Sequence, residues 1–147
     1  MRTIADLDEL ARLVGGSDDL YVRWSHGPDR DLERTSRDEL TGGRLPGLSA
    51  NPLTVEPWWG NRPVRLWVAR RIYDYLHLEH RRPSDVRPWV MRGDERGRGP
   101  DNEPLVECRE PLAWLDQRVV EEAVAEVDGQ SEATWGPLDR AAGHDGG

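Results

Sequence analysis

The stretch PVRLWVARRIYDYLHLEHRRPSDVRPWVMR, residues 63–92, joins the clearest helix of the sequence to a strand and decides the fold class. Apolar side chains recur every three or four residues over 63–80, which is the period of one helix face. Pro63 suits a first helical turn, and Pro83 limits continuation of the helix. Residues 86–92 carry the β-branched and aromatic types that favour a strand. This segment therefore predicts helices packed on a sheet.

The other elements follow the same two periods more weakly. A helix is predicted over 3–14 with Thr3 as its cap, and a strand over 19–25. A last helix is predicted to open at Pro111 and to end at Gly129. The segments expected between them are a polar loop at 28–43 with a short helix at 35–40, an extended segment at 45–49, irregular structure at 51–63, a glycine-rich loop at 93–104 and a strand at 105–109. This order predicts an α+β domain with a small, mostly antiparallel sheet packed with about three helices.

Length and composition limit the organisation and the chemistry. The 147 residues fit one domain, which we expect to span 1–128 and to be followed by a flexible tail at 129–147. Within that tail, only Trp135 and Leu138 are expected to serve as anchors. All 20 basic residues are arginine, which excludes Schiff-base lysines and the phosphate-binding lysines of P-loop proteins and kinases.

The sequence gives no sign of export or of membrane insertion. No stretch approaches the roughly 20 apolar residues of a membrane span, and the N-terminus lacks the apolar region of a signal peptide. The single cysteine, Cys108, cannot form an internal disulfide, which fits a reducing compartment. We therefore expect a cytoplasmic protein with no membrane partner.

Charge is distributed unevenly along the chain. The net charge is -8, but the segments 1–56, 57–98 and 99–147 carry -4, +5 and -9. The simpler explanation of the basic middle is that it pairs with the acidic ends of the same chain. The overall negative charge disfavours nucleic acid as a partner.

The predicted strand at 19–25 places Tyr21, Arg23 and Ser25 on one face. That face is opposite to the apolar one. An arginine in the middle of a strand is costly to bury unless it meets a carboxylate or a phosphate, so Arg23 and Tyr21 are candidate ligand-binding residues. The alternative is that both lie on the solvent face of a one-sided sheet.

The glycine-rich loop at 93–104 is a second candidate. Its glycines alternate with Arg96 and Arg98, and backbone N–H groups together with arginine forks can hold an anion. We expect Arg96, Arg98 and Asn102 to contact a ligand such as a phosphate group. The alternative is a solvated hairpin loop, because no helix follows the glycines as in a nucleotide-binding turn.

The third candidate is Glu103, at the entrance of the strand that follows this loop. Its carboxylate is placed for general-base catalysis or for stabilisation of a cationic transition state, or else it is an ordinary solvated surface group. We expect no metal site, because His77 and His80 share a helix face without a third ligand. Cys108 is expected to be an inert, buried thiol.

Two resemblances add to these expectations. Four stretches are similar to segments of a family of short uncharacterised proteins of high-GC bacteria: YVRWSHGPDRD, LPGLSANPL, PWWGNRPVRLWVARRIYDYL and RGRGPDNEPLVECREP. The order Arg23, Ser49, Glu103 more distantly resembles ADP-ribosyltransferase-like domains, which cleave NAD and transfer ADP-ribose. That likeness implies NAD as the cofactor. It also implies that Arg23 holds a phosphate or ribose, that Ser49 orients the glutamate or binds the ribose, and that Glu103 stabilises the oxocarbenium-like transition state.

Three functional hypotheses follow from the sequence. The first is an ADP-ribosyltransferase or NAD glycohydrolase that uses Arg23, Ser49 and Glu103. The second is a non-enzymatic domain that binds a protein partner or a phosphate-containing ligand, and it predicts an exposed apolar patch around Trp58 and Trp59. The third, nucleic-acid binding through the arginines of 62–98, is disfavoured by the net charge of -8.

Overall fold

The computed structural model of the chain describes residues 1–31, 47–78, 86–99, 104–130 and 135, with only the backbone at 77 and 78. The short helix expected at 35–40 therefore lies outside the described residues, as do Asn102 and Glu103. Among the described residues, none of the helices is both long and apolar enough to cross a membrane.

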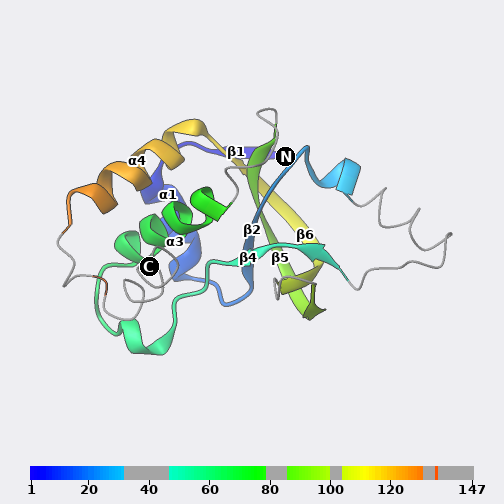
Figure 1. Ribbon diagram of the computed structural model, residues 1–147, viewed down its shortest axis with the longest axis horizontal. Coiled ribbons are helices and arrows are strands. Elements are labelled where there is room, and N and C mark those ends of the chain that lie inside the picture. Colours follow the sequence, from blue (N-terminus) through cyan, green and yellow to red (C-terminus); the bar gives the residue numbers. More distant parts are fainter. Residues whose placement is uncertain (32–46, 79–85, 100–103, 131–134, 136–147) are drawn as a thin grey trace, which may run out of the picture.

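A six-stranded sheet forms one half of the molecule (Figure 1). Its strands are β1 (Arg2–Ile4), β2 (Leu20–Ser25), β3 (Leu48–Ser49), β4 (Asn51–Pro52), β5 (Arg87–Arg98) and β6 (Pro104–Leu115). The order is β1-β6-β5-β2-β4, and β3 pairs with β6. The pairings are antiparallel except that of β1 with β6, which is parallel. The α+β class is confirmed, and the sheet is mixed rather than purely antiparallel.

Apart from the short helical turn that begins at Pro28, the described helices gather on one side of this sheet (Figure 1). They are α1 (Leu7–Gly15), the 3-10 turn η1 (Pro57–Trp59), α3 (Val64–Leu78) and α4 (Gln117–Asp128). The main core lies between them and the sheet, where Leu20, Val22 and Trp24 of β2 meet Trp67 and Ile72 of α3. The strand predicted at 19–25 is confirmed over Leu20–Ser25, and the helix predicted at 63–80 is confirmed over Val64–Leu78, since each buries the apolar face that its period indicated.

Both ends of the fold differ from the prediction. Thr3 belongs to β1, and the side chain of Asp6 caps α1 by accepting from the Glu9 N–H at 2.9 Å. Pro111 lies inside β6 rather than at the start of a helix, and α4 begins only at Gln117. In each case a strand pairing overrides a local helix signal, because β1 pairs with Ala113–Leu115 of β6.

The prediction of a loop over 93–104 is also wrong in its extent. Residues 93–98 continue β5 and pair with β6, so the connection begins only after Arg98. The glycine at 93 serves strand packing, since a Cβ there would lie 2.4 Å from the Val106 side chain and 2.8 Å from the Glu107 carbonyl oxygen. Register shifts beside Gly93 and Gly97 bend the hairpin.

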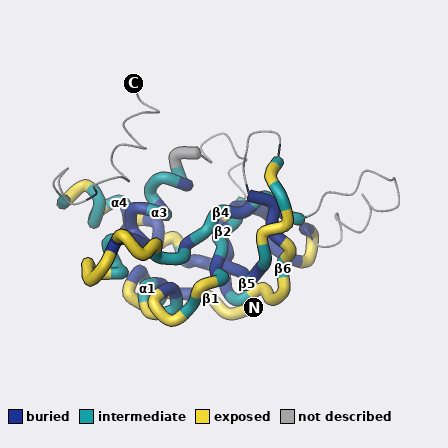
Figure 2. The backbone as a smooth tube through the Cα atoms, turned by 90° about the horizontal axis from the view of Figure 1, so that it is seen from below, coloured by how far each residue is buried: buried dark blue, intermediate teal, exposed yellow. Residues whose placement is uncertain are grey.

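A second, smaller core lies on the face of the sheet that the helices leave uncovered. It consists of buried Leu48, Ala50, Trp89, Met91 and Val106, with Tyr21, Cys108 and Trp114 packed against it. Figure 2 shows buried stretches of β5 and β6 away from the helices. Tyr21 and Arg23 therefore face neither open solvent nor the main core.

Candidate functional site

Arg23 forms an ion pair inside the second core. Its Nε donates to Asp31 Oδ2 at 2.7 Å, and its other nitrogens donate to Asp31 Oδ1 at 3.5 Å and to the Ser49 carbonyl oxygen at 2.7 Å. The side chains of Arg23 and Asp31 are only 14% and 7% exposed. The expected anion partner of Arg23 is thus a carboxylate of its own chain.

Ser25 completes this buried network. Its hydroxyl donates to Asp31 Oδ2 at 2.6 Å and accepts from Trp89 Nε1 at 2.8 Å and from the Gly27 N–H at 3.1 Å. The network ties β2 and β5 to the helical turn that starts at Pro28. Each polar side-chain atom in it has a hydrogen-bond partner within the fold, so its role here is structural. We call Arg23, Ser25, Asp31 and Trp89 the Asp31 network.

The structure brings together two members of the predicted catalytic set. Arg23 contacts Ser49, but through the main-chain oxygen of the serine and not through its hydroxyl. The third member, Glu103, and the predicted ligand residue Asn102 lie outside the described residues. Their roles stay predictions.

Tyr21, Arg96 and Arg98 have surroundings that suit an anion poorly. Burial raises the pKa of Tyr21, and the negative charges of Glu95, Asp94 and Asp19 raise it further. Arg96 Nε lies 2.7 Å from Glu107 Oε2, and Arg98 Nε lies 3.0 Å from Glu95 Oε1. Each arginine thus forms an ion pair with a carboxylate of the same hairpin. This arrangement agrees better with the alternative of a solvated hairpin than with a phosphate-binding site.

Ion pairs between the basic middle of the chain and its acidic ends recur elsewhere. Arg65 lies 2.6 Å from Asp8 and 3.6 Å from Glu126, and Arg92 lies 2.9 Å from Asp19. Desolvation raises the pKa of Asp19, but the hydrogen bonds from Arg109 and Arg92 and the positive charges of these two arginines together outweigh it, so the pKa is lowered. The basic middle segment of the sequence is therefore paired, at these positions, with the acidic segments on either side of it.

Four tryptophans form a cluster at the N-terminal end of α3. Trp58, Trp59 and Trp67 meet edge to face with ring centroids 5.5–5.7 Å apart, and Trp135 stacks on Trp59 at 6.5 Å. Trp59 is 1% exposed and Trp58 is 38% exposed. The exposed apolar patch predicted around Trp58 and Trp59 is therefore smaller than expected, because Trp58 is exposed and Trp59 is not. We call these four residues the tryptophan cluster.

Charged side chains lie against the tryptophan cluster. The guanidinium of Arg62 lies 5.2 Å from the Trp59 ring centroid, and that of Arg71 lies 4.6 Å from the Trp67 centroid. Glu56 Oε2 accepts from both Trp58 Nε1 and Arg71 at 3.2 Å. One carboxylate thus bridges an indole N–H and a guanidinium at this surface.

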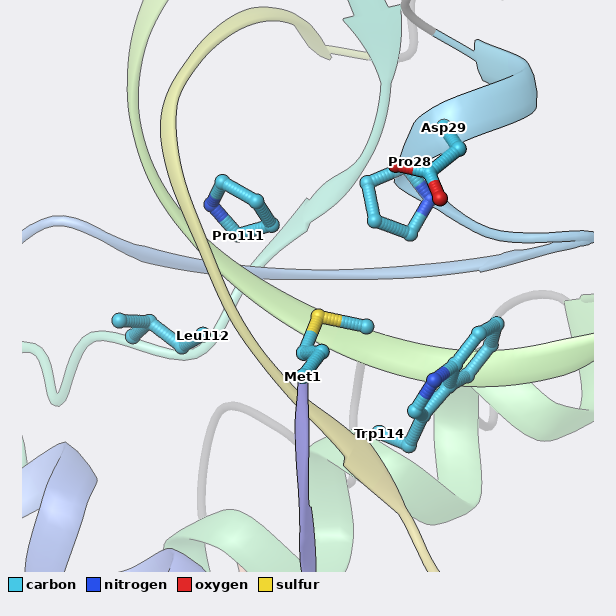
Figure 3. A pocket seen from close by; sticks show the side chains of 6 residues that line it. All are labelled: Met1, Pro28, Asp29, Pro111, Leu112 and Trp114. Carbon is cyan, nitrogen blue, oxygen red and sulfur yellow. The ribbon is translucent and has the colours of Figure 1, made fainter.

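A cavity of about 430 Å³ lies on the other side of the molecule, where the N-terminus meets β6 (Figure 3). Its lining consists of the charged side chain of Asp29, of Met1, which carries the N-terminal amino group, and of Pro28, Pro111, Leu112 and Trp114. Sequence reasoning missed it, because its walls come from segments far apart in the chain. The only local signal was the Gly27–Pro28 turn.

Among the described residues, no group of three His, Cys, Asp or Glu side chains could hold a metal ion. The side chains of His77 and His80 are not among those described. Burial raises the pKa of the Cys108 thiol, which keeps it protonated and agrees with an unreactive cysteine.

Comparison with known proteins leaves the function open. The model of a family of unknown function, DUF6098, matches residues 1–136. No curated protein and no solved structure matches the chain. The matched range includes the Asp31 network, the tryptophan cluster and the cavity, so all three lie within the family's domain.

Proposed function

The chain belongs to this family of unknown function, and we propose that it is a non-catalytic domain that binds an acidic, apolar segment of a partner protein through Trp58. The observation that carries the proposal is the half-exposed ring of Trp58 on an otherwise buried tryptophan cluster. Trp and Arg are the residue types that dominate the energetics of protein interfaces, and both are present here.

The tryptophan cluster is a rigid support for such an anchor. Trp59 and Trp67 are buried behind Trp58, and their indole N–H groups donate to the carbonyl oxygens of Pro63 and Leu53 at 3.1 Å. A side chain that is already fixed loses little rotamer entropy on binding. Trp58 therefore offers its apolar ring to a partner at low entropic cost.

The chemistry of the partner follows from Glu56. Its exposed carboxylate accepts from the Trp58 indole and from Arg71, and a partner carboxylate can take the same donors. The guanidinium of Arg62, over Trp59, adds positive charge on the same rim. The complementary segment thus presents an apolar or proline side chain to Trp58 and an acidic one to the arginines.

A peptide library displayed on phage tests this function. We expect the intact protein to enrich peptides in which Asp or Glu adjoins Pro or an aromatic residue. In Trp58→Ala, their affinity should fall by at least about 2 kcal/mol, which is about thirtyfold in Kd. Arg118→Ala, on the exposed face of α4, is the matched control and should bind as the wild type does. Peptides that bind Trp58→Ala equally well would exclude this surface.

The predicted alternative ligand is a phosphate group held by Arg96 and Arg98. Arg96 and Arg98 pair with Glu107 and Glu95 much as Arg71 pairs with Glu56, so these ion pairs do not decide between the two places. The choice rests on the exposed ring of Trp58, since no exposed large apolar side chain among the described residues accompanies the two hairpin arginines. We therefore place the binding surface at Trp58 and not at the hairpin.

An NAD-using enzyme is the second candidate, and one observation favours it. Arg23 and Ser49, two members of the predicted catalytic set, are in contact at 2.7 Å. If Glu103 completes the set, the protein releases nicotinamide from NAD, and Glu103→Gln abolishes the release without changing the melting temperature. Absence of nicotinamide release by the wild-type protein, measured by chromatography, would eliminate this candidate.

A further inference from the structure

Two hydrogen-bond donors beside the exposed tryptophan are held in place by the fold. The ring of Trp58 meets the buried rings of Trp59 and Trp67 edge to face, at a centroid distance of 5.7 Å in both cases. The guanidinium of Arg71 lies 4.6 Å from the Trp67 centroid, and its side chain is only 20% exposed. The tryptophan cluster therefore fixes the positions of both donors, the Trp58 indole N–H and the Arg71 guanidinium.

The acceptor of these two donors is held much less firmly. Glu56 Oε2 accepts from both at 3.2 Å, and the Glu56 side chain is 53% exposed. Because both bonds go to one oxygen, the carboxylate does not make the two-pronged contact that is strongest with arginine. Within the described part of the chain, Arg71 Nε is buried and has no hydrogen-bond partner, so Glu56 leaves the guanidinium incompletely satisfied. An exposed pair of this kind contributes little, and the Glu56 side chain can leave it at low cost.

The main chain of Glu56 does not have to move for this to happen. Its carbonyl oxygen accepts from the Trp59 N–H at 3.0 Å, and its extended backbone leads into Pro57 at the start of η1. The exposed side chain is the part that reaches across to Arg71 on α3. A change of its rotamer is therefore enough to free both donors.

We propose that Glu56 is an intramolecular competitor that sets the specificity of the Trp58 surface: it occupies the two donors in the free protein and leaves them when a partner carboxylate takes its place. This inference rests on the proposed function and concerns which ligands the surface selects. Two carboxylates at the same donors repel each other, so every acidic ligand must displace Glu56. A ligand that has only a carboxylate exchanges one such contact for another and gains little. An acidic ligand therefore binds well only when it also places an apolar group on Trp58, whereas a neutral apolar ligand leaves Glu56 where it is.

A matched pair of small probes tests this competition without a partner protein. Phenylacetate and phenylacetamide share an apolar ring and differ in charge, and Glu56→Gln removes the competing charge. Binding is followed by the Trp58 indole signal in ¹H–¹⁵N spectra of the ¹⁵N-labelled protein. In Glu56→Gln we expect the Kd of phenylacetate to fall at least about threefold, the size of an exposed ion pair, while that of phenylacetamide changes less than about twofold.

Glu107→Gln is the matched control, because it removes a similarly exposed carboxylate that is paired with Arg96 on the hairpin. It should leave both Kd values unchanged. The proposal would be overturned by an equal gain for both probes, by no gain for phenylacetate in Glu56→Gln, or by the same gain in Glu107→Gln. The lack of any saturable shift of the Trp58 signal in Glu56→Gln would overturn it as well.

The peptide library separates this inference from the proposed function. Acidic peptides whose binding depends on Trp58 should bind Glu56→Gln more tightly than the wild type. If such peptides bind both proteins equally, the competition is refuted and the proposed function stands. If phenylacetate shows the expected gain but the library yields no peptide, the competition is supported and the proposed function alone is refuted.

Discussion

Replacing Asp31 by asparagine tests whether the Asp31 network stabilises the fold. The substitution preserves the size of the side chain but removes the negative charge that faces Arg23 at 2.7 Å. Arg23 would then keep its hydrogen bond to the neutral carbonyl of Ser49. Because both side chains are nearly buried, the loss falls in the range for breaking a buried ion pair, and we expect about 3 kcal/mol of unfolding free energy.

Urea unfolding followed by tryptophan fluorescence measures this loss, with an unchanged m-value as the sign that the native state stays compact. Asp29→Asn, two residues earlier and exposed, is the control and should stay within about 0.5 kcal/mol of the wild type. A loss below about 1 kcal/mol for Asp31→Asn would refute the reasoning, because the pair would then be solvated. In a double-mutant cycle with Arg23→Met, we expect a coupling of at least about 1.5 kcal/mol.

Three further predictions concern single residues. Gly93→Ala should lower stability by about 2 kcal/mol in thermal unfolding, because its Cβ would collide with Val106 and the Glu107 backbone. Burial raises the pKa of Tyr75 to about 12, from 10.0, so stability should fall between pH 10 and 12 by up to about 3 kcal/mol; Tyr75→Phe should flatten this fall in urea titrations. Asp19 has a lowered pKa, so its contribution is full above pH 3.8 and disappears as the pH falls through the folded-state value; Asp19→Asn should reduce the acid-induced loss of stability in the same titrations.

The sequence predicts best those elements whose own period determines their burial. The strand with Val22 and Trp24 and the helix with Trp67 and Ile72 each have an apolar face that is visible in a few consecutive residues. Pro111 shows the opposite case. Its type suggested the first turn of a helix, yet it lies in β6 beside a register shift, where a missing N–H is tolerated.

The candidate sites were harder to predict, because the residues that meet in each site are distant in the sequence or lie in an element that the sequence did not predict. The position of Arg23 on a strand indicated correctly that it needs a negative partner, but nothing in the pattern distinguished Asp31 from a bound phosphate. Trp58 and Trp59 are neighbours of the same type, and only the fold shows that one is buried and the other half-exposed. The cavity was invisible, since it joins Met1, Asp29 and Trp114.

The pairing of β1 with β6 has a consequence for biosynthesis. Arg2–Ile4 pairs with Ala113–Leu115, so β1, which precedes the other described strands in the sequence, has no partner until β6, which follows them, has been synthesised. During that interval α1 also lacks α3 and α4, which cover its buried residues Leu7 and Leu10 in the finished fold. Closure of so long a loop makes folding slow and exposes the nascent chain to aggregation. The described sheet is therefore complete only after β6 has been synthesised, and truncation before residue 115 should leave the N-terminal segment without its native partner.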